Sequence, residues 1–253
     1  MPLIHDFSIQ LYSVRHEIEA AGFPAALEKL SEIGYTGVEF AGYGGLSAAE
    51  MTALLQRTGL KPVSAHIGLD RLEAAAGEEI AYHKALGTAY IVVPSAPFAS
   101  PEEVEATAAR LNALAPRVRE AGFGFGYHNH DFEFRTDGGR YRLERLLELA
   151  PDVDLQLDVF WASRAGCDCA AFMTKYASRI TMLHIKQMDA SGECADLGDG
   201  VLDFAALIGL GLQNGVREYI HEQETFSGDA FAGLARGYRH ILSLQQGSLT
   251  PDP

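Results

Sequence analysis

Four side chains that can bind a metal ion each follow a short run of apolar residues. They recur at intervals of roughly 30 residues, which is also about the length of one strand–helix unit with parallel strands. We therefore expect them at equivalent positions on successive strands, where a closed parallel sheet makes such positions neighbours. The four residues are His128, Asp158, His184 and Glu222.

These four side chains offer nitrogen and oxygen ligands without a thiolate. Such a set suits one Mn²⁺, Zn²⁺, Co²⁺ or Fe²⁺ ion better than Ca²⁺, and Mg²⁺ is a further option. The ion would polarise a carbonyl or hydroxyl oxygen and so acidify the adjacent C–H bond. Glu222 could take that proton, and His128, His130 or Glu133 could act as acid or base on the other face. The catalytic candidates are thus Glu222, His130 and His128, with His128 either a ligand or a base.

Other polar and aromatic residues near the ends of the apolar runs are candidates for substrate contact. Lys186 lies two residues beyond His184, so the two side chains should face the same way along an extended strand. The alternative for Glu39 is a surface carboxylate, and for Trp161 a core or rim aromatic. The substrate-contact candidates are Gln10, Glu39, His66, Glu133, Trp161 and Lys186. His221 should instead point away from this site, as a structural histidine.

Short β-rich runs alternate with amphipathic segments along the chain, and this alternation predicts the elements that must position the site. We expect strands at 7–13, 36–40, 62–66, 89–94, 124–130, 155–161, 180–186 and 218–224. We expect helices at 24–33, 47–55, 73–86, 100–120, 141–149, 168–176, 204–212 and 229–244, and a frayed tail at 246–253. Eight strand–helix pairs without a linker predict an α/β fold, a single (β/α)8 TIM barrel domain over residues 1–253. The alternative, an open doubly wound sheet, lacks its glycine-rich dinucleotide turn after the first strand.

The bulk composition agrees with such a barrel and argues against several functions. The chain has 253 residues, close to the roughly 250 that are typical of the fold. A net charge of -14, with no cluster of lysine and arginine, disfavours nucleic acid as a partner. Three cysteines are too few for a disulfide framework. Without a signal peptide or an apolar run of about 20 residues, we expect a cytoplasmic protein with no membrane partner. A homodimer is one option for the oligomeric state.

At the level of ordered motifs, the chain resembles the sugar phosphate isomerase/epimerase family of the xylose isomerase-like TIM barrel superfamily, from about residue 7 to 245. The motifs that carry the resemblance lie at 10–15, 34–40, 65–68, 127–134, 183–186, 198–204 and 219–224. The resemblance implies a divalent metal, with Asp158, His184 and Glu222 on the family's Asp, His and Glu positions.

The fourth ligand position departs from the family pattern. Ketose epimerases and several dehydratases of the superfamily carry glutamate there, whereas this chain has His128, with His130 where some lyase relatives carry a histidine. A second departure is Gln187, where relatives often have aspartate. These departures argue against a mechanism with two paired glutamates and remain compatible with a bound metal.

The resemblance implies a metal-dependent enzyme that acts on a small polyhydroxylated carbonyl compound, a sugar or cyclitol, through proton abstraction and an enediolate. We rank isomerase or epimerase first, and a dehydratase or lyase of the inosose or 3-keto-sugar type second. An endonuclease IV-like repair enzyme would need more metal ligands and a basic DNA-binding face. A non-catalytic sugar-binding barrel would hold no stoichiometric metal.

Overall fold

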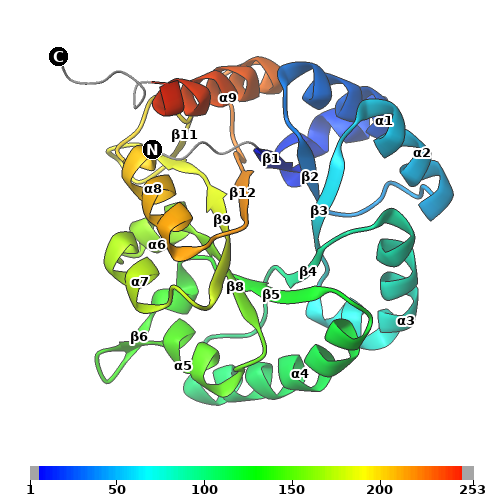
Figure 1. Cartoon of the computed structure of the whole chain (residues 1–253). Helices are drawn as coiled ribbons and strands as arrows, with labels where there is room; N and C mark the ends of the chain where they lie inside the picture. Colours follow the sequence, from blue (N-terminus) through cyan, green and yellow to red (C-terminus); the bar gives the residue numbers. More distant parts are fainter. Residues whose placement is uncertain (1–5, 247–253) are drawn as a thin grey trace.

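A closed barrel of eight parallel strands forms the centre of the molecule (Figure 1), in a computed structural model that describes residues 6–246. The strand order around the barrel is β1-β12-β9-β8-β5-β4-β3-β2. This arrangement confirms the predicted (β/α)8 TIM barrel. The barrel strands are β1 (Ser8–Gln10), β2 (Gly37–Phe40), β3 (Lys61–His66), β4 (Tyr90–Val93), β5 (Gly124–His128), β8 (Asp154–Asp158), β9 (Ile180–Ile185) and β12 (Glu218–His221).

The helices form an outer ring around these strands (Figure 1). Their apolar faces pack on outward-facing strand residues such as Leu155 and Leu183, which belong to the main hydrophobic core. The helices are α1 (Arg15–Ile33), α2 (Ala48–Thr58), α3 (Leu69–Leu86), α4 (Pro101–Glu120), α5 (Arg142–Leu149), α6 (Val159–Arg164), α7 (Cys169–Lys175), α8 (Phe204–Asn214) and α9 (Ala230–Gln246). Apart from Gln246, which ends α9, the predicted frayed tail lies outside the described residues.

The period of two along each strand divides the barrel interior into layers. In β9, Leu183 belongs to the core under the helices, whereas Met182 packs with Tyr90 and Val92 in a separate small apolar cluster. Residues two apart share one side of a strand. His184 therefore follows Met182 on the same side, one layer nearer the carboxyl ends of the strands. The alternation thus places polar side chains in the layer directly above this apolar cluster.

Several helix ends follow from local sequence. Ser47 and Glu50 form the expected capping box at the start of α2. Pro101 opens α4, where its missing N–H costs nothing, and the Ser100 side chain accepts a hydrogen bond from the Glu103 N–H. Gly34 ends α1 with a φ of 117°, a conformation that glycine adopts without strain.

The main departures from the predicted elements lie beside the carboxyl ends of the strands. The first strand stops at Gln10, and residues Leu11–Val14 form the short helix η1. The sixth predicted strand, 155–161, instead ends at Asp158, where α6 begins at once, so Trp161 lies on a helix. A second short helix and two small hairpins were not predicted either. They are η2 (Phe132–Phe134), the hairpin of β6 (Thr136–Asp137) with β7 (Arg140–Tyr141), and that of β10 (Gln187–Met188) with β11 (Cys194–Ala195).

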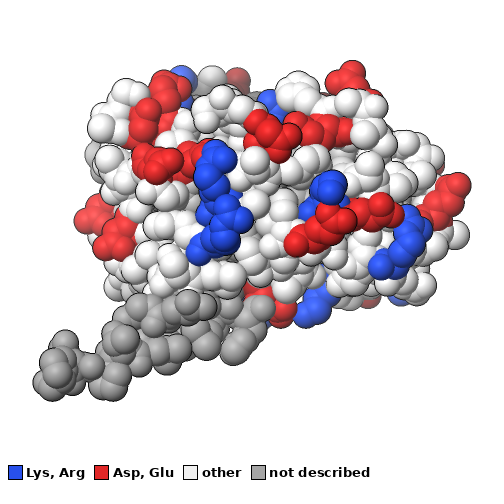
Figure 2. All heavy atoms as spheres, turned by 90° about the horizontal axis from the view of Figure 1, so that it is seen from above, with Lys and Arg blue, Asp and Glu red and all other residues white. Residues whose placement is uncertain are grey.

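The surface carries charges of both signs. On the face shown in Figure 2, lysine and arginine side chains lie beside aspartate and glutamate rather than in one basic patch. Ion pairs such as Arg110 with Glu73 and Arg142 with Asp137 account for part of this mixing. Within residues 6–246, no helix has both the length and the apolar character needed to cross a membrane.

Candidate metal centre

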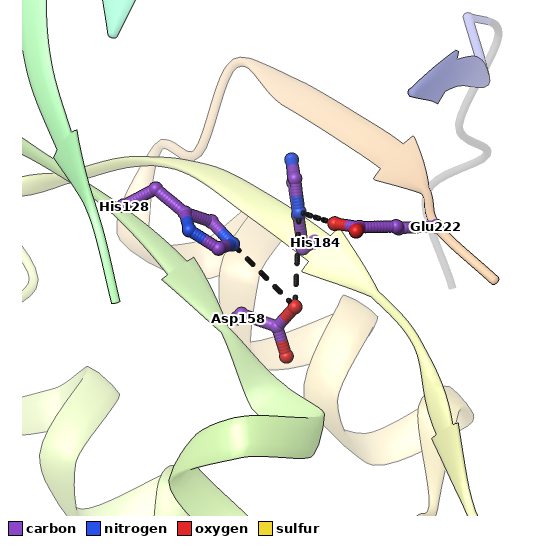
Figure 3. Close-up of side chains that lie close together, drawn as sticks. All are labelled: His128, Asp158, His184 and Glu222. Atoms are coloured by element: carbon purple, nitrogen blue, oxygen red, sulfur yellow. Dashed lines mark ion pairs between the residues drawn. The ribbon is translucent and has the colours of Figure 1, made fainter. Parts of the chain in front are cut away.

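The four predicted metal ligands come together at the carboxyl end of the barrel, from four strands that are consecutive in the sheet, β5, β8, β9 and β12 (Figure 3). His128 and Asp158 end β5 and β8, His184 lies near the end of β9, and Glu222 directly follows β12. The strand register pairs Asp158 with His184 and Ile220 with His184. Sheet pairing therefore brings together, in one cluster, candidate ligands that are far apart in the sequence.

One ligand atom from each of these residues lies within 4.8 Å of the others. His184 Nδ1 is 2.6 Å from Glu222 Oε2 and 3.7 Å from Asp158 Oδ2, and His128 Nε2 is 3.6 Å from the same Asp158 oxygen. All four side chains are buried. Spacing of this kind lets a single cation contact every member of the set.

Apart from these ion pairs with one another, the same four atoms have no hydrogen-bond partner in the described part of the chain. They are His128 Nε2, Asp158 Oδ2, His184 Nδ1 and Glu222 Oε2. A buried polar atom without a partner costs about 1–3 kcal/mol, and more when the group is charged. Four such atoms that converge on one point are the donor set that a divalent cation satisfies. The residues present therefore fit a metal ion.

The remaining atoms of two ligands are engaged in ways that leave the converging atoms available. Asp158 Oδ1 accepts the Trp161 N–H at 3.0 Å and caps α6, which leaves Oδ2 for the centre. His128 Nδ1 lies 3.3 Å from the Pro94 carbonyl oxygen, which can only accept, so this nitrogen carries the proton and Nε2 the lone pair. Outer contacts of this kind orient metal ligands in many proteins.

Mutual electrostatics keep the two carboxylates ionised. Burial opposes ionisation of Asp158, but the nearby His128 and His184 rings outweigh this effect and lower its pKa below the usual value. Burial likewise opposes ionisation of Glu222, while Lys186 and His184 lower its pKa to about 2. Burial disfavours the charged form of His184, yet Glu39 and Glu222 raise its pKa well above the usual value. Protons and a metal ion would therefore compete for this imidazole.

A pocket of about 580 Å³ opens above the centre. It includes two of the proposed ligands, His128 and Glu222, and the proposed catalytic residue His130. The lining residues are Tyr12, Ala41, His66, Pro94, His128, His130, Trp161, Glu222 and Glu224. Two of the predicted substrate contacts, His66 and Trp161, therefore lie where a small molecule above the centre would meet them.

Lys186 is fully buried behind this lining. Its Nζ donates to Glu224 Oε1 at 2.5 Å and lies 4.6 Å from the ring centroid of Trp161 and 4.9 Å from that of Phe160. Burial disfavours its charge, but Glu222 and Asp158 raise its pKa above the usual value. The lysine is thus held as a cation between the metal centre and a pocket-lining carboxylate.

Three other predicted substrate contacts do not line the pocket. Gln10, Glu39 and Glu133 are fully buried. Glu133 accepts hydrogen bonds from the Tyr127 hydroxyl and the His130 N–H, both at 2.8 Å, and burial raises its pKa to about 7. The carboxylates of Glu39 and Glu133 and the amide of Gln10 are bonded to protein groups, so contact of these three residues with a substrate stays a prediction.

His130 lies beside the centre rather than in it. Its Nδ1 is buried without a hydrogen-bond partner among residues 6–246, and its ring stacks on Phe132 at a centroid distance of 5.5 Å. Burial lowers the pKa of His130 to about 4, so the ring is neutral at neutral pH. His221 points away from the site, as expected, with Nδ1 2.6 Å from the Tyr35 hydroxyl.

Sequence reasoning missed three residues of this site. Glu224 lies two residues beyond Glu222, and Gln156 two residues before Asp158, so the period of two along a strand could have indicated both. Tyr12 lies in η1, which was expected as a strand, and its side chain is 46% exposed at the pocket. No feature of its local sequence indicates that position.

Comparison with solved structures finds the same barrel in several proteins. A sugar phosphate isomerase/epimerase from Parabacteroides distasonis superimposes with a TM-score of 0.83 at 23% identity, over 94% of this chain and 97% of that one. A D-allulose 3-epimerase from Methylomonas sp. gives 0.73 at 17% identity, over 96% and 99%. A "probable 3-DHS dehydratase" from Bacillus anthracis gives 0.73 at 14% identity, over 94% and 98%. At these identities the likeness shows a shared fold.

Comparison at the sequence level gives the family. No curated protein matches the chain. The family model described as "Xylose isomerase-like TIM barrel" matches residues 27–242, which is most of the sequence. The matched region contains every barrel strand except β1. The family predicted from the ordered motifs is thereby confirmed, and the chain belongs to the xylose isomerase-like TIM barrel family.

Proposed function

We propose that this protein is a divalent-metal-dependent isomerase or epimerase of a small polyhydroxylated carbonyl compound. The observation that carries the proposal is the convergence of four atoms that have no hydrogen-bond partner outside their own cluster, from His128, Asp158, His184 and Glu222, beneath a pocket of about 580 Å³. The ligand types favour Mn²⁺, Zn²⁺, Co²⁺ or Fe²⁺, with Mg²⁺ as an option. Such an ion, when bound, polarises a substrate oxygen and acidifies the neighbouring C–H bond.

Glu222 is the proposed base on one face of the substrate. It lines the pocket, and its pKa of about 2 keeps it ionised at neutral pH. Lys186 and His184 supply the positive field that holds this charge in place. A carboxylate that binds the ion through one oxygen keeps a second oxygen that can accept a proton.

His130 is the proposed acid or base on the other face. It lines the same pocket, is neutral at neutral pH, and has an Nδ1 without a partner in the described residues. Its N–H backbone group donates to Glu133 at 2.8 Å, which fixes the loop that carries the ring. Isomerisation or epimerisation then requires that a proton removed by one group return from the same or the opposite group.

The substrate class follows from the lining of the pocket. Two carboxylates, Glu222 and Glu224, line it, and none of its described lining residues is a lysine or arginine. A phosphate dianion would meet repulsion there without a compensating cation on the lining. We therefore propose an uncharged sugar or cyclitol, with Trp161 and His66 as contacts.

A second candidate is a lyase that uses the same proton abstraction and then expels a β-hydroxyl or alkoxyl group. His128 favours it, because a histidine at this ligand position leaves Glu222 as the single carboxylate of the centre that lines the pocket. An epimerase mechanism with two paired carboxylates would need a second carboxylate of the centre at the pocket. His130, which lines the same pocket, can instead serve proton transfer on the leaving-group side.

Proton NMR of candidate keto-sugars and inososes in D₂O with the Mn²⁺- or Zn²⁺-loaded protein tests the proposal. Deuterium that enters beside the carbonyl supports the proton-abstraction step, and the product identifies the class: a stereoisomer or ketose–aldose isomer for the first candidate, an unsaturated product for the second. Loaded protein that promotes neither exchange nor conversion of any of these compounds would favour a binding barrel instead. The Asp158→Ala protein is the control for exchange catalysed by free metal.

A further inference from the structure

A single carboxylate, Glu39, lies at the centre of a buried hydrogen-bond network under the metal centre. The side chain is fully buried at the end of β2. Its Oε1 is 2.6 Å from His184 Nε2 and 2.7 Å from Gln10 Nε2. Its Oε2 is 2.5 Å from the Ser64 hydroxyl and 2.6 Å from Gln156 Nε2. Amide N–H groups donate to both oxygens, from Gln10 to Oε1 and from Gln156 to Oε2, so we assign Glu39 as an ionised carboxylate that accepts from all four groups.

The orientation of Gln10 supports this assignment. The Tyr12 N–H donates to Gln10 Oε1 at 2.9 Å, so the amide nitrogen of Gln10 must face Glu39. Because a carboxylate only accepts hydrogen bonds, every group that faces Glu39 must present a donor.

For His184, this requirement places the proton on Nε2. The other ring nitrogen, Nδ1, lies 2.6 Å from Glu222 Oε2 and is then the nitrogen that must release its proton and offer a lone pair when a metal binds. A ring held from behind by a carboxylate is oriented and made more basic as a ligand.

For His66, the requirement acts through Gln156. Because Gln156 Nε2 faces Glu39, Gln156 Oε1 must be the atom 2.7 Å from His66 Nε2, and this oxygen can only accept. His66 Nε2 also lies 3.2 Å from Glu39 Oε1. The His66 proton is therefore on Nε2, and Nδ1 of this pocket-lining ring keeps its lone pair.

We propose that Glu39 is a positioning residue that sets the tautomers of two histidines, His184 in the metal centre and His66 in the pocket. The part that concerns His184 rests on the proposed metal-dependent function; the part that concerns His66 does not. One carboxylate thereby orients the His184 ring toward the proposed metal and leaves Nδ1 of His66 as a proton acceptor in the pocket. It acts from below and does not touch the substrate.

The first test compares the Mn²⁺ affinity of the wild type with that of Glu39→Gln by calorimetric titration. Loss of an outer-shell partner should weaken metal affinity by about 10- to 100-fold. The matched control is Glu79→Gln, another buried carboxylate, which is bonded to Tyr43 and Arg71 on the outside of the barrel and should leave affinity unchanged. Equal affinity in Glu39→Gln and the wild type would overturn the role toward His184.

A milder pair of variants keeps the test valid if Glu39→Gln does not fold. Glu39→Asp keeps the charge but withdraws it from His184, and should still weaken metal binding. Ser64→Ala removes one donor from the other oxygen, leaves the His184 contact, and should bind metal within about threefold of the wild type. A Glu39→Asp protein that binds as tightly as Ser64→Ala would count against the proposal.

The second test reads the tautomer directly and needs no metal. Two-bond ¹H–¹⁵N correlation spectra of histidine-labelled protein at about pH 8 should show His66, assigned by its loss in His66→Asn, as the Nε2–H form. In Glu39→Gln or Glu39→Asp, that pattern should shift toward a mixture of tautomers. A wild-type His66 in the Nδ1–H form would overturn the inference even if the metal centre is correct. A wild type that binds no metal would instead sink the proposed function and leave the His66 result standing.

Discussion

Asp158 and His184 stand directly opposite each other on the adjacent strands β8 and β9, with Asp158 Oδ2 3.7 Å from His184 Nδ1. Their pairing results from the register of the barrel, which the apolar residues on both strands hold in place. The geometry of the centre is therefore set by the fold, and either ligand can be removed without removing the strands that carry it.

Asp158→Ala or His184→Ala should abolish metal retention while the barrel stays folded. Each change removes a ligand and also relieves a cluster of buried charges, so we expect only a modest change in thermal stability for the metal-free proteins. Metal content by elemental analysis and the circular dichroism spectrum check the two halves of the prediction. Asp154→Ala, at the opposite end of β8 and partly exposed beside Arg119, is the matched control and should keep the metal. Wild-type metal content in both ligand variants would refute the centre.

His130→Ala should keep the metal yet lose turnover by about 100-fold or more, because a positioned acid or base typically contributes a factor of this order. The variant is measured by metal content and by deuterium exchange into substrate under the same conditions. A His130→Ala protein without metal would mean that ligand and base are exchanged between His128 and His130.

Metal affinity should fall as the pH is lowered from about 8 to about 6. Glu39 and Glu222 raise the pKa of His184 well above its usual value, so protons compete increasingly with the metal for this imidazole as the pH falls. Displacement of one proton weakens apparent affinity by about tenfold per pH unit below that pKa. Mn²⁺ titrations in buffers of different ionisation enthalpy measure both the affinity and the proton released. A pH-independent affinity without proton release would contradict this prediction.

Glu133 should make the metal-free protein less stable as the pH rises through the window from about 4.5 to 7. Its pKa is about 7 in the folded chain, above the unfolded value near 4.5, so the folded state binds more protons in this window. The contribution is fully present below about pH 4.5 and is lost by about pH 7, with an upper size of about 3 kcal/mol.

The measurement is urea unfolding of the wild type and Glu133→Gln at about pH 5 and pH 8, both with chelator. The neutral amide lacks this titration, so the stability of the variant relative to the wild type should improve by about 1–3 kcal/mol at the higher pH. Parallel pH dependences of the two proteins would show that Glu133 does not titrate as described.

Much of the fold was open to prediction, because each barrel strand is an apolar run and most helices have a clear start signal. Ser47 and Glu50 at α2 and Pro101 at α4 are examples of such signals. The errors lie where the chain leaves the barrel at its carboxyl end. There Asp158 caps α6, and Gln10 caps η1 by accepting the Tyr12 N–H. A short polar cap followed by aromatic residues has the composition of a strand, so periodicity alone could not separate the two.

The clustering of the four ligand residues could be predicted because strand spacing determines which residues are neighbours in a barrel. How deeply each side chain is buried could not be predicted. Glu39 is the last residue but one of β2 and His66 ends β3, yet the first is fully buried and the second lines the pocket. That difference depends on the stagger of β2 against β3, which includes a register shift between Val38 and Glu39. Local sequence does not encode such a shift in a recognisable way.

The central claim, a catalytic divalent metal held by His128, Asp158, His184 and Glu222, is tested most directly by elemental analysis. Protein is purified without chelator, loaded with Mn²⁺ or Zn²⁺, and dialysed beside the Asp158→Ala variant. The account predicts about one ion per chain in the wild type and close to none in the variant. A wild type that retains no stoichiometric ion after loading, or a variant that retains as much as the wild type, would contradict it.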